Sequence, residues 1–105
     1  METSELVAQE LLWERQRQQD KLGWVPEHDD EHKLGEIAGM AALYALPPNV
    51  RMWDATSTGF GETLGEAICP YGWVAKPGDR RRELVKAGAL IIAEIERLDR
   101  IAPKG

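Results

Sequence analysis

The sequence predicts an all-α domain, a compact bundle of three to four helices. Three segments carry apolar residues at helical spacing, and residues that start or stop helices flank each of them. These segments are residues 4–21, 30–45 and 79–101. The chain has 105 residues, which is the size of one small domain, so we assign residues 1–105 to a single helical domain.

The first predicted helix covers residues 4–21. Ser4 can cap its N-terminus, and Gly23 can end it. The first half carries an apolar stripe, whereas the second half is polar all round. We expect the stripe to face the core. Its members are Leu6, Val7, Leu11, Leu12 and Trp13.

The second predicted helix covers residues 30–45. Its apolar residues repeat at spacings of four and three residues, and several of them are alanines. Glycines at positions 35 and 39 leave little side-chain bulk, so another helix can approach closely. Pro47 and Pro48 end the segment, because a residue before proline is disfavoured in helical conformation.

Residues 46–78 form the longest connection and show no sustained period. They are rich in proline and glycine, and a connection of this length is usually functional or disordered. Aromatic residues argue against disorder, which favours aromatic-poor composition. They are Trp53, Phe60, Tyr71 and Trp73. We therefore expect a long, aromatic-containing loop with a short helical turn within residues 62–68.

The last predicted helix covers residues 79–101, with Asp79 as its N-cap. Its apolar positions alternate at spacings of four and three residues, which is a heptad seam. The seam consists of Leu84, Gly88, Ile91, Ile95, Leu98 and Ala102. One protomer cannot easily cover both this seam and the small-residue face of residues 30–45. We therefore expect a homo-oligomer, at least a dimer.

Composition excludes several broad classes of function. The net charge of −5 argues against general binding to nucleic-acid backbones. The single cysteine, Cys69, cannot form an intramolecular disulfide, which suits a reducing cytoplasm. The acidic N-terminus lacks the features of a signal peptide, and no apolar run reaches the length of about 20 residues that spans a membrane. We expect no membrane association.

Residues 26–36 are dense in carboxylates and contain both histidines of the chain. Carboxylate oxygens suit Mg²⁺, which is usually held by one or two carboxylates together with substrate phosphates. Glu83, on the last helix, is a further carboxylate source. The candidate metal ligands are Asp29, Asp30, Glu36 and Glu83, and the candidate catalytic residues are Glu36 and Glu83. The competing interpretation is an acidic helix N-terminus that meets the helix dipole.

His28, His32 and Glu36 are each four residues apart. On one continuous helix they would share a face. The pattern differs from the HExxH signature of zinc proteases, which has an internal glutamate. A structural role, as caps or surface groups, is the simpler interpretation of both histidines.

Arginines occupy positions 80–82, where the positive end of a helix dipole makes three cations unfavourable without an anion. A phosphate at the helix N-terminus could supply that anion, because arginine binds two phosphate oxygens at once. Spacing allows at most two of the three to serve one ligand, and Lys76 could add a charge. We nominate Arg80, Arg81 and Lys76 for phosphate. Trp24 and Trp73 could stack a base, or they could simply cover a small core.

Four stretches of the chain resemble a group of small phage and prophage proteins: residues 14–18, 23–32, 35–38 and 76–100. This group looks like a relative of the MazG-type all-α nucleoside triphosphate pyrophosphohydrolases, which cleave nucleotides to the monophosphate and pyrophosphate with Mg²⁺. The resemblance implies a MazG-like bundle, a nucleotide or nucleotide-derived ligand and Mg²⁺ as the cofactor. For a phage protein it also implies the cytoplasm of a bacterial host.

The chain departs from the signature of that larger family, which is EExxE on one helix and ExxD on the next. Residues 30–45 lack the first spacing, and Lys86 stands where the ExxD aspartate would be. A lysine repels a metal ion but leaves phosphate binding intact. Two functions therefore stay open, a Mg²⁺-dependent pyrophosphohydrolase and a non-catalytic protein that sequesters a nucleotide of host defence signalling. A helical interaction module is the third alternative.

Overall fold

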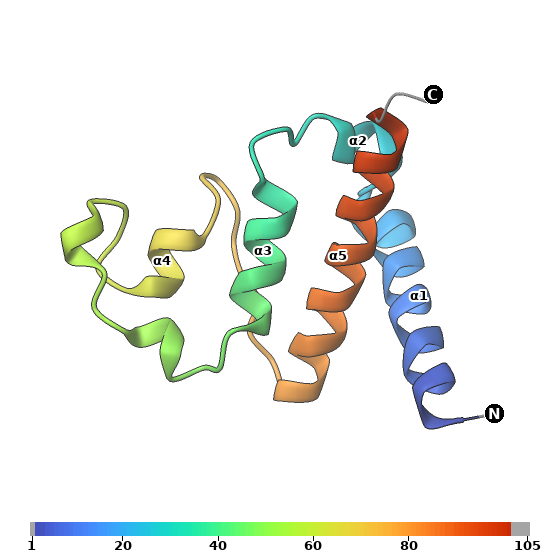
Figure 1. Cartoon of the computed structure of the whole chain (residues 1–105), viewed down its shortest axis with the longest axis horizontal. Helices are drawn as coiled ribbons and strands as arrows, with labels where there is room; N and C mark the ends of the chain where they lie inside the picture. Colours follow the sequence, from blue (N-terminus) through green and yellow to red (C-terminus); the bar gives the residue numbers. More distant parts are fainter. Residues whose placement is uncertain (1, 102–105) are drawn as a thin grey trace.

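Three helices lie side by side in the computed structural model, which describes residues 2–101 (Figure 1). The middle helix, α5 (Arg80–Ile101), packs against α1 (Thr3–Leu22) on one side and α3 (Glu36–Ala45) on the other. Helices α1 and α5 run in the same direction, and α3 runs opposite to them (Figure 1). The described residues form helices and turns with no strand, which confirms the all-α class.

The second helix predicted from the sequence is divided in two. A short helix, α2 (Pro26–Asp30), packs against α5, and a turn then leads to α3. Proline at the first position starts α2, where its missing N–H costs nothing. Gly35 has a φ of 85°, a left-handed conformation that interrupts the helix before Glu36. The prediction that residues 30–45 form one continuous helix was therefore wrong.

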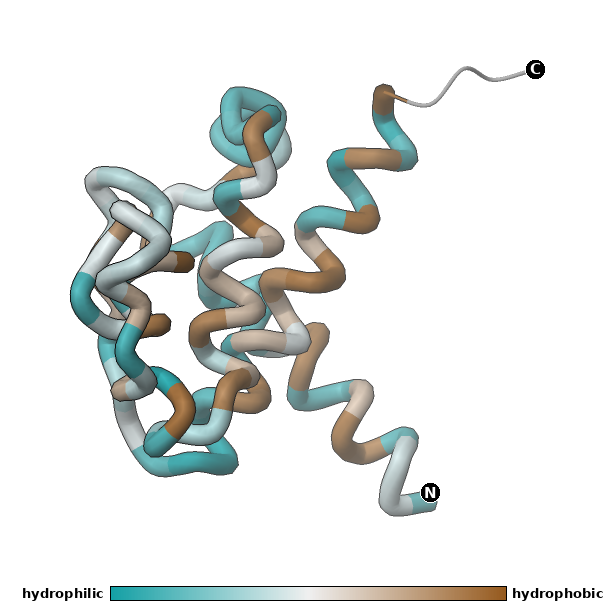
Figure 2. Tube along the Cα trace, turned by 60° about the vertical axis from the view of Figure 1, so that its left-hand side comes forward, coloured by the Kyte–Doolittle hydropathy of each residue, from teal (hydrophilic) through white to brown (hydrophobic). Residues whose placement is uncertain are grey.

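Helix α1 buries its polar half, contrary to the prediction that its apolar stripe faces the core. Leu6, Leu12 and Trp13 are 52 %, 52 % and 66 % exposed, and of the same stripe Leu11 packs against Gly88 of α5. The first turns of α1 project beyond the other helices (Figure 2). The buried residues of α1 are Glu14, Arg15 and Gln18. Gly23 ends the helix in the left-handed conformation, as predicted.

The core lies mainly between α3 and α5. Each helix contributes apolar side chains that are almost fully buried, among them Ile37, Met40, Leu43, Tyr44, Ala87, Leu90 and Ala93. On the other side of α5, a Cβ atom added to Gly88 would lie 2.7 Å from the Leu11 Cδ2 atom. The absence of a side chain at this position therefore lets α1 and α5 approach closely.

The large residues of the predicted heptad seam face solvent, whereas Gly88 of the seam packs against Leu11 of α1 and Ala102 lies outside the described residues. The large members of the seam are between 46 % and 53 % exposed: Leu84, Ile91, Ile95 and Leu98. An apolar groove of about 280 Å³ runs between this face and the exposed alanines of α3. The side of α5 that packs in the protomer is a different one, with Val85, Ala89 and Leu90 at its centre.

The connection from α3 to α5 contains two 3₁₀ turns, η1 (Val50–Met52) and η2 (Thr56–Thr58), and helix α4 (Leu64–Ile68). Helix α4 confirms the helical turn predicted within residues 62–68, and Thr63 caps it by accepting a hydrogen bond from the Glu66 amide. The connection then returns past α3 to the start of α5 (Figure 1). Within residues 2–101, no helix combines the length and apolar character that crossing a membrane requires.

Candidate ligand-binding site

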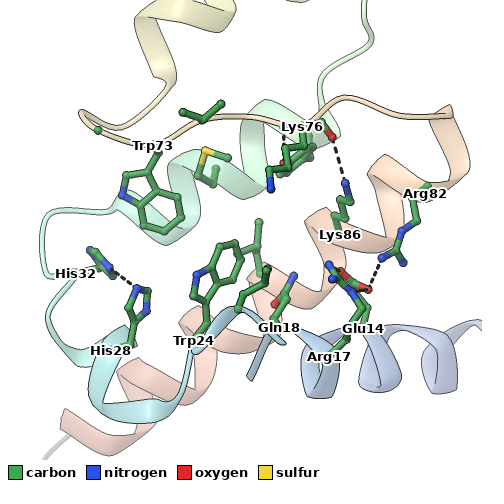
Figure 3. Close-up of a pocket in the computed structure, with 16 residues that line it drawn as sticks. Glu14, Arg17, Gln18, Trp24, His28, His32, Trp73, Lys76, Arg82 and Lys86 are labelled. Carbon is green, nitrogen blue, oxygen red and sulfur yellow. Dashed lines mark hydrogen bonds and ion pairs between the residues drawn. The ribbon is translucent and has the colours of Figure 1, made fainter. Parts of the chain in front are cut away.

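A cavity of about 570 Å³ lies where α1, α2, α3 and α5 meet the segment of residues 72–76 (Figure 3). This volume lies within the range of small-molecule sites, roughly 300–1,000 Å³. Its lining divides into an aromatic end, a cationic end and a buried amide between them (Figure 3). The three parts come from segments far apart in the sequence.

The aromatic end consists of two tryptophans and two histidines. The Trp24 ring is stacked on His28 at a centroid distance of 6.2 Å and an interplanar angle of 9°. The Trp73 ring lies 5.8 Å from Trp24 and meets the edge of His32 at 5.0 Å. Both tryptophans are only partly buried, so part of each ring remains exposed to solvent at this end of the cavity.

The cationic end is built around Glu14 on α1. This carboxylate is 3 % exposed and accepts two hydrogen bonds from Arg17, each of 2.9 Å. It also pairs with Arg82 of α5 at 2.6 Å. Burial alone would raise the pKa of Glu14, but the hydrogen bonds from the two arginines outweigh it and hold the pKa below its ordinary value. One carboxylate thus orients two arginines.

Lys86 adds a third cation that has no carboxylate partner in the described residues. Its Nζ atom donates a hydrogen bond to the Lys76 carbonyl at 3.1 Å and lies 5.4 Å from the Tyr44 ring centroid. Burial lowers the pKa of Lys86, and repulsion by Arg82 lowers it further. The protein therefore holds this ammonium in an environment that disfavours its charge, which an anion in the cavity would relieve.

Gln18 separates the two ends of the cavity (Figure 3). The residue is 2 % exposed, and its Oε1 atom has no hydrogen-bond partner. Leaving a buried acceptor without a donor costs about 1–3 kcal/mol. An unsatisfied buried amide oxygen is uncommon in folded proteins, and this one lies behind the cavity wall, out of contact with solvent.

Three of the residues that the sequence nominated for substrate binding line this one cavity. They are Trp24, Trp73 and Lys76. The backbone amide of Lys76 donates to the Tyr44 hydroxyl at 2.9 Å, which fixes the segment across the cavity. The same segment carries Trp73 at the aromatic end, so residues 73–76 contribute to both ends of the cavity.

The other nominated arginines lie outside the cavity. Arg80 donates to the carbonyls of Tyr44, Ala45 and Leu46, so it caps the C-terminus of α3. Arg81 is exposed and forms a bidentate pair with Glu10 at 2.7 and 2.6 Å. The third arginine of the run, Arg82, is the one that reaches the cavity.

The carboxylates nominated for metal binding lie at separate places, each with a partner of its own. Asp29 is buried and accepts a hydrogen bond from Arg15 at 2.7 Å. Asp30 pairs with Arg100 of α5 at 2.7 Å. In both cases an arginine supplies the positive charge that a metal ion would otherwise provide.

The two candidate catalytic carboxylates are engaged in the same way. Glu83 is 1 % exposed and pairs with Arg51 through two hydrogen bonds of 2.9 and 3.0 Å. Glu36 faces His32 at 3.2 Å and accepts the Leu34 amide at 2.7 Å. Residues 2–101 contain no group of three or more His, Cys, Asp and Glu side chains that could hold a metal ion. The nominated residues therefore do not fit a magnesium centre.

Sequence reasoning missed six polar residues of the cavity: Glu14, Arg17, Gln18, Tyr44, Arg82 and Lys86. A signal existed for two of them, because Arg82 and Lys86 are four residues apart and share one face of α5. No comparable pattern marks Gln18. It lies in the polar half of α1, for which the sequence predicts exposure to solvent.

This arrangement can hold a flat aromatic group at one end and an anionic group at the other. Tryptophan faces offer stacking, and two arginines and a lysine offer charge-assisted hydrogen bonds. The four carboxylates nominated for metal binding or catalysis are each paired with a cation or a histidine. Comparisons of the chain with protein-family models, curated proteins and solved structures found no match.

Proposed function

We propose that the protein binds a nucleotide or nucleotide-derived molecule in this cavity and does not hydrolyse it. The observation that carries the proposal is the cluster of Arg17, Arg82 and Lys86 around a single carboxylate, next to two accessible tryptophans. A phosphate would neutralise the excess positive charge, and a base would stack on the aromatic end. Each feature alone is common, but together they match the two halves of a nucleotide.

At the aromatic end, stacking of a base on Trp24 or Trp73 would contribute about 1–3 kcal/mol. At the cationic end, Arg82 and Lys86 would bind phosphate oxygens, and Glu14 would keep both arginines in place. The resemblance to MazG-type proteins supports the same class of ligand.

Binding without hydrolysis points to sequestration. Lys86 places a positive charge where the MazG-type signature has an aspartate, and the nominated carboxylates are dispersed and paired. A phage protein of this kind would act in the cytoplasm of its bacterial host by lowering the concentration of a free nucleotide signal. Its affinity would then not depend on Mg²⁺.

The exposed apolar face of α5 and α3 supports a homo-oligomer as part of this proposal. Ile91 and Ile95 lie beside the alanines of α3 and together form one apolar strip. A second copy of the chain would bury this strip at a gain of roughly 25 cal/mol for each Å² removed from water. The cavity lies elsewhere on the chain, so assembly through this strip would leave the ligand site open.

Calorimetric titration with a panel of nucleotides, with and without Mg²⁺, tests the proposal. Neighbouring arginines give a matched pair of variants. Arg82→Ala should weaken binding by about 1.5–3 kcal/mol, the range for hydrogen bonds to charged groups. Arg81→Ala should bind like the parent, because Arg81 pairs with Glu10 outside the cavity. Equal losses in the two variants, or no nucleotide binding by the parent, would favour the helical interaction module instead.

Lys86→Met separates ligand binding from folding. Lys86 is repelled by neighbouring cations, so its replacement should raise the melting temperature of the free protein while weakening nucleotide binding. Circular dichroism and calorimetry measure the two effects on one sample. A variant that loses stability and keeps its affinity would contradict a phosphate-binding role for this lysine.

A further inference from the structure

The two histidines of the chain face one another at the aromatic end of the cavity (Figure 3). Their Nε2 atoms are 3.4 Å apart, and their ring centroids are 4.7 Å apart at an interplanar angle of 65°. His28 belongs to α2 and His32 to the turn that follows it. The break before α3 therefore does not separate them, and the local fold brings both rings together.

A carboxylate stands behind each ring. His32 Nδ1 lies 3.2 Å from Glu36 Oε2, and His28 Nδ1 lies 3.4 Å from Asp29 Oδ1. Arg15 holds the other oxygen of Asp29, which fixes the orientation of that carboxylate. A carboxylate can only accept a hydrogen bond, so the proton of each neutral imidazole is placed on Nδ1. With both protons on Nδ1, the two Nε2 atoms present lone pairs to the space between them, where one Nε2–H would otherwise donate a hydrogen bond to the other Nε2.

We propose that His28 and His32 bind a divalent transition-metal ion of the class that imidazole prefers, such as Zn²⁺ or Cu²⁺, through their Nε2 atoms. Two nitrogen ligands at about 2.0–2.1 Å from a tetrahedral zinc lie about 3.3–3.4 Å apart, which matches the observed separation. Histidine ligands typically donate their second N–H to a carboxylate, the role that Glu36 and Asp29 are placed to fill.

The site is open. The side chains of His28 and His32 are 33 % and 20 % exposed, so an ion can reach them from solvent. The described residues offer no third His, Cys, Asp or Glu ligand in a group with these two. Water would therefore complete the coordination, and the ion would sit beside Trp24 and Trp73.

The full chain without a polyhistidine tag is titrated with Cu²⁺, Zn²⁺ and Mg²⁺ near neutral pH, with no nucleotide present. We expect one Cu²⁺ or Zn²⁺ per chain and no response to Mg²⁺. Cu²⁺ should quench tryptophan fluorescence, because the Trp73 ring lies 5.0 Å from that of His32. This result is independent of nucleotide binding, so it can fail while the proposed function stands.

Variants decide whether the histidines are the ligands. His28→Ala and His32→Ala should each weaken Cu²⁺ binding at least tenfold, and Glu36→Gln should weaken it about 10- to 100-fold. Cys69→Ser is the control and should bind like the parent, because the thiol donates to the Trp73 carbonyl instead. Circular dichroism checks that each variant is folded. An unchanged affinity in a folded double histidine variant, or no stoichiometric binding by the parent, would overturn the proposal.

Discussion

Arg81 and Arg82 are adjacent and chemically identical, yet only Arg82 faces the cavity. Side chains of consecutive residues in a helix point about 100° apart. The rotation of α5 against its neighbours therefore decides which of the two arginines faces the cavity. Composition shows that three arginines need an anion. It does not show that Glu10 and Glu14 of α1 neutralise two of them. Only the packing of α1 on α5 settles that Arg82, oriented by Glu14, is the arginine that faces the cavity.

Glu83 illustrates the same point for a carboxylate that the sequence nominated for catalysis. Hydrogen bonds from Arg51 lower the pKa of Glu83, and burial opposes them without reversing the shift. A lowered pKa means that the pair stabilises the fold above the ordinary carboxyl pKa of about 4.3. That stability is lost as the pH falls through the lowered pKa of the folded state.

We therefore predict that Glu83→Gln lowers the free energy of unfolding by about 3 kcal/mol near pH 7, because it leaves the Arg51 guanidinium without its partner. The difference from the parent should shrink as the pH falls through the lowered pKa of Glu83, because the carboxyl group of the parent then becomes protonated. Urea denaturation at several pH values measures this. Asp99→Asn, at an exposed position of the same helix, should change stability by less than about 0.5 kcal/mol. A difference that does not vary with pH would show that the charge of Glu83 is unimportant.

At the scale of elements, helix type and number were largely predictable from apolar spacing and from Gly23, Asp79 and the prolines that follow α3. Which side of each helix is buried could not be predicted in this way. The polar half of α1 is buried because its charged groups find partners on α2 and α5, with Arg15 contacting Asp29 and Glu96. A hydropathy pattern treats such residues as exposed, so it misplaces both faces of the helix.

The break at Gly35 is the sharpest difference between the sequence prediction and the structure. We predict that Gly35→Ala costs about 1–2 kcal/mol of stability, the penalty for a side chain in left-handed conformation. Gly78→Ala is the matched control, because an added Cβ meets open space at both positions but only Gly35 has a positive φ. Chemical denaturation compares them. A Gly35→Ala protein as stable as the control would indicate that residues 30–45 form one continuous helix after all.

At the scale of the molecule, two surfaces compete for the role of functional site. The cavity combines charged with aromatic and aliphatic side chains and is built by four helices and residues 72–76, whereas the exposed strip on α5 and α3 is apolar. The α5 part of the strip could be predicted as a heptad seam, because the residues that form it follow one another at regular spacing within a single helix. The sequence revealed only Trp24, Trp73 and Lys76 of the cavity, because the residues that meet there extend from Glu14 to Leu90 and share no pattern.

Adjacent residues of α5 can separate assembly from folding. Ile91 is 49 % exposed on the strip, and Leu90 is 2 % exposed in the core. We predict that Ile91→Asp yields a folded monomer, because the new charge would be buried only in an oligomer. Leu90→Asp should unfold the chain, because there the charge is buried within the protomer. Sedimentation gives the mass of each variant, and circular dichroism gives its helix content.

The same Ile91→Asp variant tests whether the cavity needs the oligomer. All the residues that line the cavity come from one chain, so the monomeric variant should keep the nucleotide affinity of the parent. A parent that is already monomeric at micromolar concentration would reject the assembly prediction. A monomeric variant that is folded but no longer binds nucleotide would show instead that a second protomer contributes to the site, and the two surfaces would then serve one function.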